Sequence, residues 1–391
     1  MRKNIYPILL SGLTLMTLSA CSGGAGESDK LATVQIEKTF DVKDFDNISD
    51  KVEIIETFHP EFTDSSMFSL PVLLAIVNGK AYMHEGEWMN VFDYPSGKLV
   101  EAFNHHGPGP EEYMRSYYSY YQPATTDWTV YDNNNWGHER LVQYDKDGKF
   151  IRSLENDSIQ SLAPINGGGW LAYNGCTSFA GGFHNVRDKK IYQYDSDWQL
   201  EFIFPLKDRR WGVQGTSLMD EVLGYDGKNY VVDSDTIYQI DTDNHKLIAQ
   251  IALNLGKCGC DWGAIETAEE LRDAEISHIK IQAPIFNSDY IFARYTVIDL
   301  AAKMQIVVYD IYSLANGELV YRRKLPLEGD YSLCQFFEGF PVEVDGETVY
   351  GWPMKFVEDG CFYIIVASDE MARIKDTDEV NPTIVKIRIK D

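Results

Sequence analysis

The chain has 391 residues and a formal net charge of −25 at pH 7, with 60 acidic and 35 basic side chains. Because so acidic a protein repels phosphate groups, this balance argues against nucleic acid as a partner and against attraction to anionic lipid headgroups. Hydrophobic residues make up 44% of the chain, which is enough for a large core. The apolar stretch near the N-terminus is too short to be a convincing membrane span, and no second stretch is long enough to span a bilayer.

The N-terminus has the three parts of a secretory signal. Two basic residues open the chain, the apolar stretch Ile5–Leu18 follows, and Leu18–Cys21 closes it with an aliphatic residue, two small residues and a cysteine. This last run resembles the bacterial lipobox, in which the cysteine sulfur carries a diacylglycerol. We therefore expect residues 1–20 to be a lipoprotein signal peptide. Lipid on Cys21 would anchor the protein to a membrane of the cell envelope, which we expect to be the outer membrane, with surface exposure as an open alternative.

Residues 21–33 contain mainly small and polar side chains after the cysteine, which is typical of a flexible tether. We expect the rest of the chain, residues 34–391, to form one domain.

A short pattern recurs along that domain: an aromatic or aliphatic residue, Asp, a few turn residues, and then an apolar residue. It occurs at Phe92–Leu99, Tyr144–Phe150, Tyr194–Leu200 and Ile240–Leu247, and in a longer version at Tyr309–Leu319. Asp caps a tight turn with its side chain and Gly or Asn supplies a positive φ, so the pattern predicts β-hairpins. The first three intervals are close to the roughly 40–50 residues of a four-stranded propeller blade. The fourth is longer and predicts an insertion.

An apolar strand precedes each turn, and a sixth such strand follows the last one. These strands are Lys80–Tyr82, Trp128–Tyr131, Trp170–Tyr173, Asn229–Val232, Tyr290–Ala293 and Cys361–Val366. Only the strand Thr383–Ile389 comes after the sixth, so the last unit lacks a strand, which either Val34–Lys38 or Val52–Glu56 could supply. The sequence therefore predicts an all-β fold, a six-bladed β-propeller closed by an N-terminal strand that completes the last blade.

The predicted insertion, residues 256–287, contains a short helix. Thr267 and Glu270 form a capping box at its start.

Three segments carry a resemblance to a known family: His106–Tyr113, Val130–Asp132 and Tyr144–Ile151. They are similar to segments of the NHL-like six-bladed β-propeller lipoproteins of Bacteroidetes, from which this chain departs at Pro110 and by an extra Glu. The resemblance covers about Val52 to the C-terminus. It implies the propeller fold and no particular activity, because members of that family mostly lack a known one.

Ligand-binding candidates cluster in a loop that should lie between the first two blades, where loops ring the mouth of the central channel. Histidines there could bind metal or move protons, carboxylates could act as acid and base, and arginine could hold an anion. We add two tryptophans flanked by polar or basic residues. The candidates are His105, His106, Glu111, Glu112, Tyr113, Arg115, Trp136 and Trp211. The alternative is that the Gly-Pro-Gly turn is a structural link between blades.

No cofactor is predicted, and two weak metal patterns remain as alternatives. Asp132 and Asn134 lie in an oxygen-rich run that could suit Ca²⁺, although no bidentate Glu follows at the EF-hand spacing. Cys258 and Cys260 could form a strained disulfide or half of a zinc site.

The chain has no P-loop, no Gly-x-Ser-x-Gly elbow, no dinucleotide fingerprint and no zincin helix. We therefore expect a membrane-anchored binding or scaffolding module for a carbohydrate, a peptide or a protein rather than an enzyme. One alternative is an enzyme of lactonase or lyase type with a metal in the central channel. Another is a subunit of a cell-surface complex, in which residues 256–287 make the contact.

Overall fold

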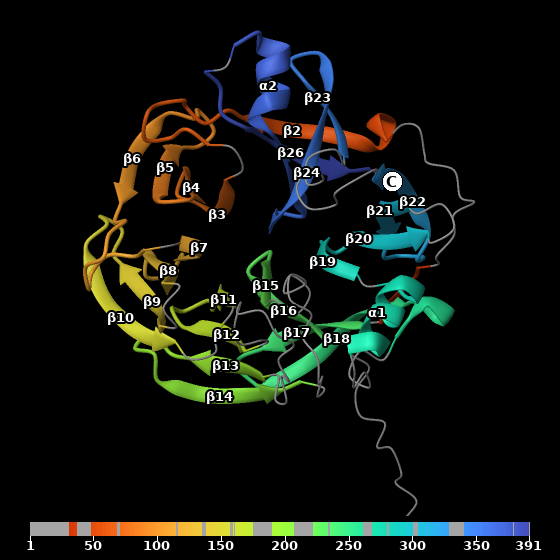
Figure 1. Ribbon diagram of the computed structural model, residues 1–391, viewed down its shortest axis with the longest axis horizontal. Helices are drawn as coiled ribbons and strands as arrows, with labels where there is room; N and C mark the ends of the chain where they lie inside the picture. Colours follow the sequence, from red (N-terminus) through yellow and green to blue (C-terminus); the bar gives the residue numbers. More distant parts are fainter. Residues whose placement is uncertain are drawn as a thin grey trace, which may run out of the picture. The chain divides into compact units, whose positions relative to one another are not determined.

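Six small sheets are arranged in a ring in the computed structural model of the protein (Figure 1). The structure describes residues 31–36, 48–68, 71–114, 116–134, 138–156, 159, 161–174, 190–206, 222–233, 235–260, 268–279, 281–299, 304–327, 340–377 and 379–390. Residues Leu31–Asp391 form one compact unit. The predicted six-bladed β-propeller is therefore confirmed.

The blades follow one another along the chain, each running from the innermost to the outermost strand. Blade 1 is β3 (Val72–Val77), β4 (Lys80–Glu85), β5 (Trp88–Asp93) and β6 (Leu99–Asn104); blade 2 is β7 (Ser116–Gln122), β8 (Asp127–Asn134), β9 (His138–Tyr144) and β10 (Phe150–Asn156). Blade 3 is β11 (Ser161–Pro164), β12 (Trp170–Asn174), β13 (Lys190–Tyr194) and β14 (Leu200–Pro205); blade 4 is β15 (Val222–Tyr225), β16 (Lys228–Asp233), β17 (Thr236–Asp241) and β18 (Lys246–Asn254). Blade 5 is β19 (Ile281–Phe286), β20 (Tyr290–Asp299), β21 (Met304–Ser313) and β22 (Leu319–Leu327).

Blade 6 closes the ring with an N-terminal strand. It contains β24 (Glu347–Glu358), β25 (Cys361–Val366), β26 (Thr383–Ile389) and, outermost, β2 (Val52–Phe58), while β23 (Phe340–Val344) pairs with the first half of β24. β2 is antiparallel to β26, with Val52 opposite Ile389 and Phe58 opposite Ile384. The predicted closure is confirmed, and Val52–Glu56 is the segment that provides it. The other candidate begins within β1 (Ala32–Gln35), which instead pairs in parallel with β18 on the outer edge of blade 4.

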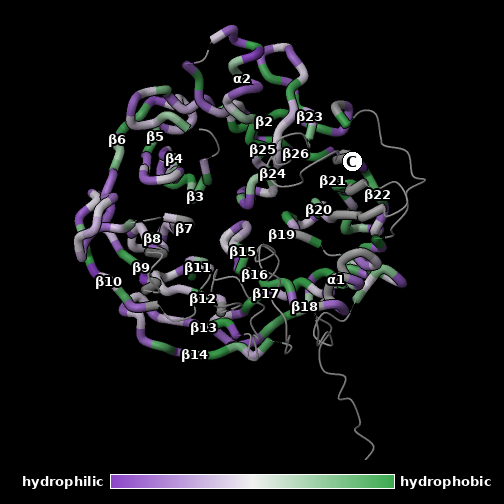
Figure 2. Tube along the Cα trace, in the orientation of Figure 1, coloured by the Kyte–Doolittle hydropathy of each residue, from purple (hydrophilic) through white to green (hydrophobic). Residues whose placement is uncertain are grey.

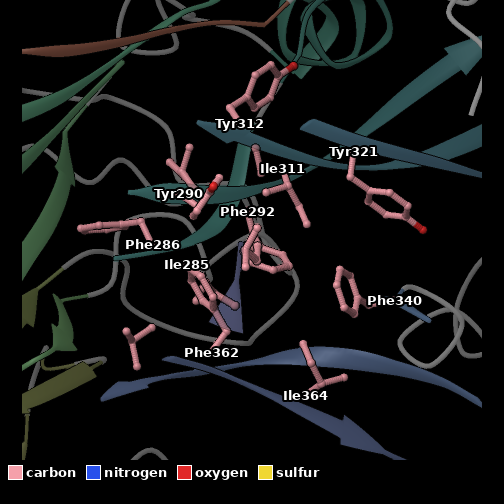
Figure 3. Packing of buried hydrophobic residues seen from close by; sticks show 14 of the residues in the cluster. Ile285, Phe286, Tyr290, Phe292, Ile311, Tyr312, Tyr321, Phe340, Phe362 and Ile364 are labelled. Atoms are coloured by element: carbon pink, nitrogen blue, oxygen red, sulfur yellow. The ribbon is translucent and has the colours of Figure 1, made fainter. Parts of the chain in front are cut away.

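The core lies between neighbouring blades, because each sheet buries both of its faces against the next. Hydrophobic positions run along the strands and hydrophilic ones gather at the turns (Figure 2). Between blades 5 and 6 the ring of Phe292 lies 4.6 Å from that of Phe362 and 5.6 Å from that of Phe340 (Figure 3). Such aromatic pairs add to the area-dependent stabilisation of the interface.

The repeated Asp turn joins the third and fourth strands of a blade, and we call it the outer turn. One residue in each of the first five outer turns has a positive φ and contacts the preceding blade: Gly97, Gly148, Trp198, His245 and Gly317. Where this residue is Gly, the preceding blade leaves no room for a side chain. Where it is aromatic, the side chain itself makes the contact, as when the His245 ring stacks on Phe202 at 4.3 Å. The repeat therefore specifies packing between blades as well as the turns.

In blade 5 the prediction that Asp310 lies in the outer turn is wrong. Asp310 lies inside β21, buried, and its carboxylate pairs with Arg322 at 2.6 Å. Ser313 takes the turn position, since its carbonyl accepts from Gly317 N–H just as that of Asp93 accepts from Gly97 N–H, both over 2.8 Å.

The insertion between blades 4 and 5 contains the predicted helix, α1 (Ala268–Ser277), after a short 3-10 turn at Gly256–Cys258. Thr267 of the predicted capping box lies outside the described residues. A second helix, α2 (Ser368–Lys375), lies between β25 and β26. Neither described helix is long and apolar enough to cross a bilayer.

Candidate functional site: the central channel

The innermost strands of five blades enclose a cavity of about 980 Å³ at the centre of the ring. Its walls come from β3, β7, β11, β15 and the second half of β24 with the residues that flank them. Ligand pockets in proteins typically measure about 300–1,000 Å³, so the cavity is large enough for a small molecule.

No described residue of blade 5 lines this cavity, and blades 4 and 6 are bonded directly to each other beside it. The Asp226 N–H donates to the Val357 carbonyl over 3.2 Å, and Gly360 N–H donates to Asp226 Oδ1 over 3.3 Å. The turn between β15 and β16 is further held by Asn166, whose Nδ2 donates to the Gly227 carbonyl over 2.7 Å. These bonds join the turns between the first and second strands of the blades, which we call the inner turns, and they narrow the cavity at that end.

The walls are mainly apolar and aromatic. On β3, Val72 is 51% exposed, and on β7 the Tyr118 side chain is 36% exposed. Trp352 and Phe356 of β24 are half-buried in the same wall. Apolar side chains left open to solvent inside a ring of β-strands are surface that a ligand can bury.

Gly224 of β15 leaves a further open space in the wall. A Cβ atom at Gly224 would meet only Asn229 Oδ1, at 3.6 Å. Because this is an ordinary contact distance, a side chain at this position would project into the cavity without displacing the fold.

Charged side chains lie at two places on the wall. Asp226, Lys228, Glu358 and Asp359 lie at or beside the inner turns of blades 4 and 6. Burial raises the pKa of Glu358, although its carboxylate accepts from the Tyr363 hydroxyl over 3.2 Å and lies 4.0 Å from the Lys386 ammonium. Lys355, by contrast, lies within the strand β24 and is exposed.

The predicted loop lies between β6 and β7 and links blades 1 and 2. Gly109 N–H donates to Glu112 Oε2 over 2.8 Å, and the fully buried Tyr113 donates its hydroxyl to the Glu87 carbonyl over 2.6 Å. The Arg140 guanidinium, from blade 2, donates to the Glu112 carbonyl. A structural link between blades requires bonds of this kind. A ligand-binding role for Glu112 and Tyr113 stays a prediction.

The other described candidates of the loop are placed at its surface or against blade 2. The His105 ring stacks on Tyr144 with 4.4 Å between centroids, and burial lowers the pKa of His105. His106 Nε2 lies 3.4 Å from Glu87 Oε1 on the exposed side. Glu111 is exposed, and its backbone carbonyl accepts from the Tyr144 hydroxyl over 2.7 Å. The loop candidates lie together, but the cavity wall does not include them.

Three candidates, Arg115, Trp136 and Trp211, fall outside the described residues, and so does the side chain of Asn134. Asp132 is fully buried, with Oδ2 accepting from Arg140 Nε over 2.8 Å and Oδ1 accepting from Met114 N–H over 2.9 Å. The calcium alternative at Asp132 and Asn134 stays a prediction.

Cys258 and Cys260 are half-buried, and because Cys258 takes part in no disulfide, the alternative of a disulfide between them is wrong. Cys258 packs against the core, and its carbonyl accepts from Ile279 N–H over 2.8 Å, which holds the segment in place without a covalent link. Within the described part of the chain, no three His, Cys, Asp or Glu side chains form a group that could hold a metal ion.

A ring of six blades around a channel of ligand size defines a six-bladed β-propeller protein. The chain belongs to the family described as "Domain of unknown function (DUF4934)", whose model matches residues 31–390. No curated protein matches it.

Solved structures agree on the fold. A Bacteroides fragilis protein whose export has been inferred is similar over 92% of this chain and 100% of its own length, with a TM-score of 0.58 and 12% identity. A Bacteroides caccae protein of unknown function covers 65% of this chain and 80% of its own, with a TM-score of 0.34 and 9% identity. The WD40 domain of SCAP from fission yeast covers 81% and 84%, with a TM-score of 0.33 and 10% identity. At these identities the first likeness shows the fold alone, and the other two carry no argument.

Proposed function

We propose that this protein is a lipid-anchored binding module of the cell envelope whose ligand enters the central channel. The observation that carries the proposal is the cavity of about 980 Å³ with its apolar and aromatic wall. Burying such a wall under a ligand contributes roughly 25 cal/mol for each Å² removed from water.

Polar groups on the wall support binding rather than catalysis, because several of them serve the fold. The Gln122 side chain donates from Nε2 to the Gly169 carbonyl over 2.6 Å and its Oε1 accepts from Ala124 N–H over 3.2 Å. Asn229 donates from Nδ2 to the Pro164 carbonyl over 3.0 Å. Because the side chains of Gln122 and Asn229 are engaged in this way, the wall would bind a ligand through its shape and its apolar surface.

The anchor rests on the signal-like N-terminus and the lipobox-like run that ends at Cys21. The first described strand, β1, lies on the outer edge of blade 4, so a tether from Cys21 would reach the ring at that blade. Expressed in a bacterial host that lipidates proteins, the chain should enter the membrane fraction and gain the mass of a diacylglyceryl group. A Cys21→Ala chain recovered in the membrane fraction at the wild-type level would refute the anchor.

The channel is tested with a neutral fluorescent apolar probe, N-phenyl-1-naphthylamine, titrated against the chain without its signal peptide. Gly224→Phe should fill the cavity and weaken probe binding at least roughly ten-fold, because the phenyl group takes the space of the ligand. Lys246→Phe adds the same group on the exposed outer strand of the same blade and should change nothing. Equal affinities of wild type and Gly224→Phe, with both folded by circular dichroism, would contradict a ligand in the channel.

A further inference from the structure

We infer that the ligand of the channel is an extended peptide segment, which pairs through its backbone with the free edge of β15. The inference rests on the proposed function, since it names the ligand class of the same cavity. It starts from the backbone of the inner strands, because the side chains of Gln122 and Asn229 in the wall already serve the fold.

Each of four innermost strands has a neighbouring strand on one side only. β3, β7, β11 and β15 stand at the ends of their sheets, and residues of all four line the cavity. On the other side of such a strand, the backbone N–H and C=O groups have no strand of the same sheet to bond with, and an unpaired edge of this kind is a template for a further strand. The wall of the channel therefore presents backbone donors and acceptors as well as apolar side chains.

The hairpin of β15 and β16 shows which residue directs its backbone to the free edge. Asp226 and Gly227 both have a positive φ. Tyr225 is opposite Lys228, so these two residues form a two-residue turn. The pair that flanks such a turn is hydrogen-bonded, and hydrogen-bonded and non-hydrogen-bonded pairs alternate along the ladder. Gly224 therefore belongs to a non-hydrogen-bonded pair, and its N–H and C=O point away from β16 toward the channel.

Gly224 also leaves room for a partner strand. It is exposed and belongs to the cavity wall, and no hydrogen bond between described residues of different blades involves it. When two strands pair, a large side chain opposite a glycine packs over the space that the glycine leaves. A Cβ atom at Gly224 would meet only Asn229 Oδ1, so that space is open. A peptide residue with a large side chain therefore fits opposite Gly224.

The rest of the wall suits the side chains of an extended peptide. Val72 and Tyr118 are exposed in the wall, and Phe356 is half-buried there. Successive side chains of a strand point to opposite sides, so a peptide with apolar residues at alternate positions would bury this surface while its backbone pairs with β15. A hydrocarbon ligand would bury the same surface and leave the edge of β15 unpaired.

The test displaces N-phenyl-1-naphthylamine with the hexapeptide acetyl-Thr-Val-Thr-Phe-Thr-Val-amide. Two derivatives are N-methylated, one at every Thr and the other at Val, Phe and Val. In an extended chain these two sets of N–H groups point to opposite sides, and only one side faces β15. The parent peptide should displace the probe. One derivative should bind at least roughly ten-fold more weakly than the parent, and the other should stay within about three-fold of it.

Two substitutions of Gly224 test the same bonds from the side of the protein. Gly224→Pro removes the N–H that points into the channel, and proline is tolerated at an edge whose N–H the ladder does not use. It should weaken the parent peptide roughly ten-fold and leave binding of the probe unchanged. Gly224→Ala is the matched control, because it keeps the N–H and its Cβ atom has an ordinary contact of 3.6 Å with Asn229 Oδ1. It should bind the peptide within about three-fold of wild type.

The outcomes separate this inference from the proposed function. Suppose that the probe binds and Gly224→Phe blocks it. If the parent peptide then fails to displace the probe, or if the two methylated derivatives lose affinity equally, the peptide class is overturned and the channel stands. A Gly224→Pro chain that is folded by circular dichroism and binds the peptide as wild type does would also overturn pairing at β15. Should that variant fail to fold, the two derivatives decide the question on the wild-type chain. If neither the probe nor the peptide binds, both the peptide class and the proposed function fail.

Discussion

Gly97 lies where the ring closes, and its replacement by Ala tests the closure directly. The residue is in the outer turn of blade 1, with φ +76°, against the chain that leaves β2, the last strand of blade 6. A Cβ atom there would lie 1.9 Å from the His59 carbonyl oxygen and 2.8 Å from its carbon. Because backbone occupies that space, Gly97→Ala forces the two blades apart.

The cost of Gly97→Ala has two parts. An Ala residue in the left-handed region costs roughly 1–2 kcal/mol. Displacing the turn also strains two hydrogen bonds of 2.8 Å, from Gly97 N–H to the Asp93 carbonyl and from Glu61 N–H to the Gly97 carbonyl. At about 1 kcal/mol for each bond, the free energy of unfolding should fall by roughly 3–4 kcal/mol in total.

Urea unfolding followed by tryptophan fluorescence measures this loss, and Gly86 provides the matched control. Gly86 also has a positive φ, +59°, but a Cβ atom there would meet nothing within 4 Å. Gly86→Ala should therefore show only the left-handed cost of roughly 1–2 kcal/mol. If Gly97→Ala loses no more stability than Gly86→Ala, the contact between the outer turn and the preceding blade does not hold the ring closed.

Three further perturbations test buried polar groups. Burial lowers the pKa of His84, which is 3% exposed, from 6.5 to about 4. As the pH drops, the unfolded chain therefore binds the proton before the folded one does, and the free energy of unfolding should fall by about 3 kcal/mol between pH 6.5 and 4. Urea unfolding at a series of pH values measures this fall, and the His84 contribution to it should be absent in His84→Gln. Asn90 is fully buried and neither atom of its side-chain amide has a hydrogen-bond partner among the described residues, so Asn90→Leu should raise the thermal midpoint, and a lower midpoint would contradict this. Arg322→Met leaves the Asp310 carboxylate buried without its cation and should cost about 3–5 kcal/mol in urea unfolding, part of which Asp310→Leu in the same chain should restore.

The blade repeat was predictable because its signals are local. Asp93 and Gly97 form their turn through bonds between residues a few positions apart, and the same holds in the next blades. Closure was predictable from a count of strands, although choosing between two N-terminal segments was not. Both β1 and β2 add a strand to the edge of a blade, but β1 pairs in parallel with β18 and β2 pairs antiparallel with β26.

The fifth repeat shows where a local pattern fails. Tyr309-Asp310 has the letters of the turn, but Asp310 pairs with Arg322 on the next strand and also accepts from the Tyr295 and Tyr312 hydroxyls at 2.8 and 2.7 Å. Those partners come together only after the strands have paired. A buried carboxylate network and a capped turn thus share a sequence pattern and differ in their distant partners.

The site was harder to predict for the same physical reason. The loop candidates were conspicuous because polar residues cluster there in sequence, yet Arg140, from a later strand, bonds to that loop. The channel wall gives no such local signal. Its residues come from five blades, in short segments that lie far apart in the sequence. Whether a residue such as Lys355 points into the channel depends on a shift in register, which alternation along a strand does not reveal.

Blades 4 and 6 share a contact that the repeat does not predict. In blades 1 to 5 the first strand of the repeat is the innermost one, and β24 takes that place in blade 6, so the repeat alone would place six inner strands around the channel. The bonds of Asp226 to Val357 and Gly360 join blades 4 and 6 directly, and no described residue of β19 lines the cavity. Asp226 itself has a φ of +48°, a conformation that Asp tolerates better than most residues and that aims its N–H and carboxylate at blade 6. One inner turn of blade 4 therefore makes a direct contact with blade 6 that the repeat does not predict.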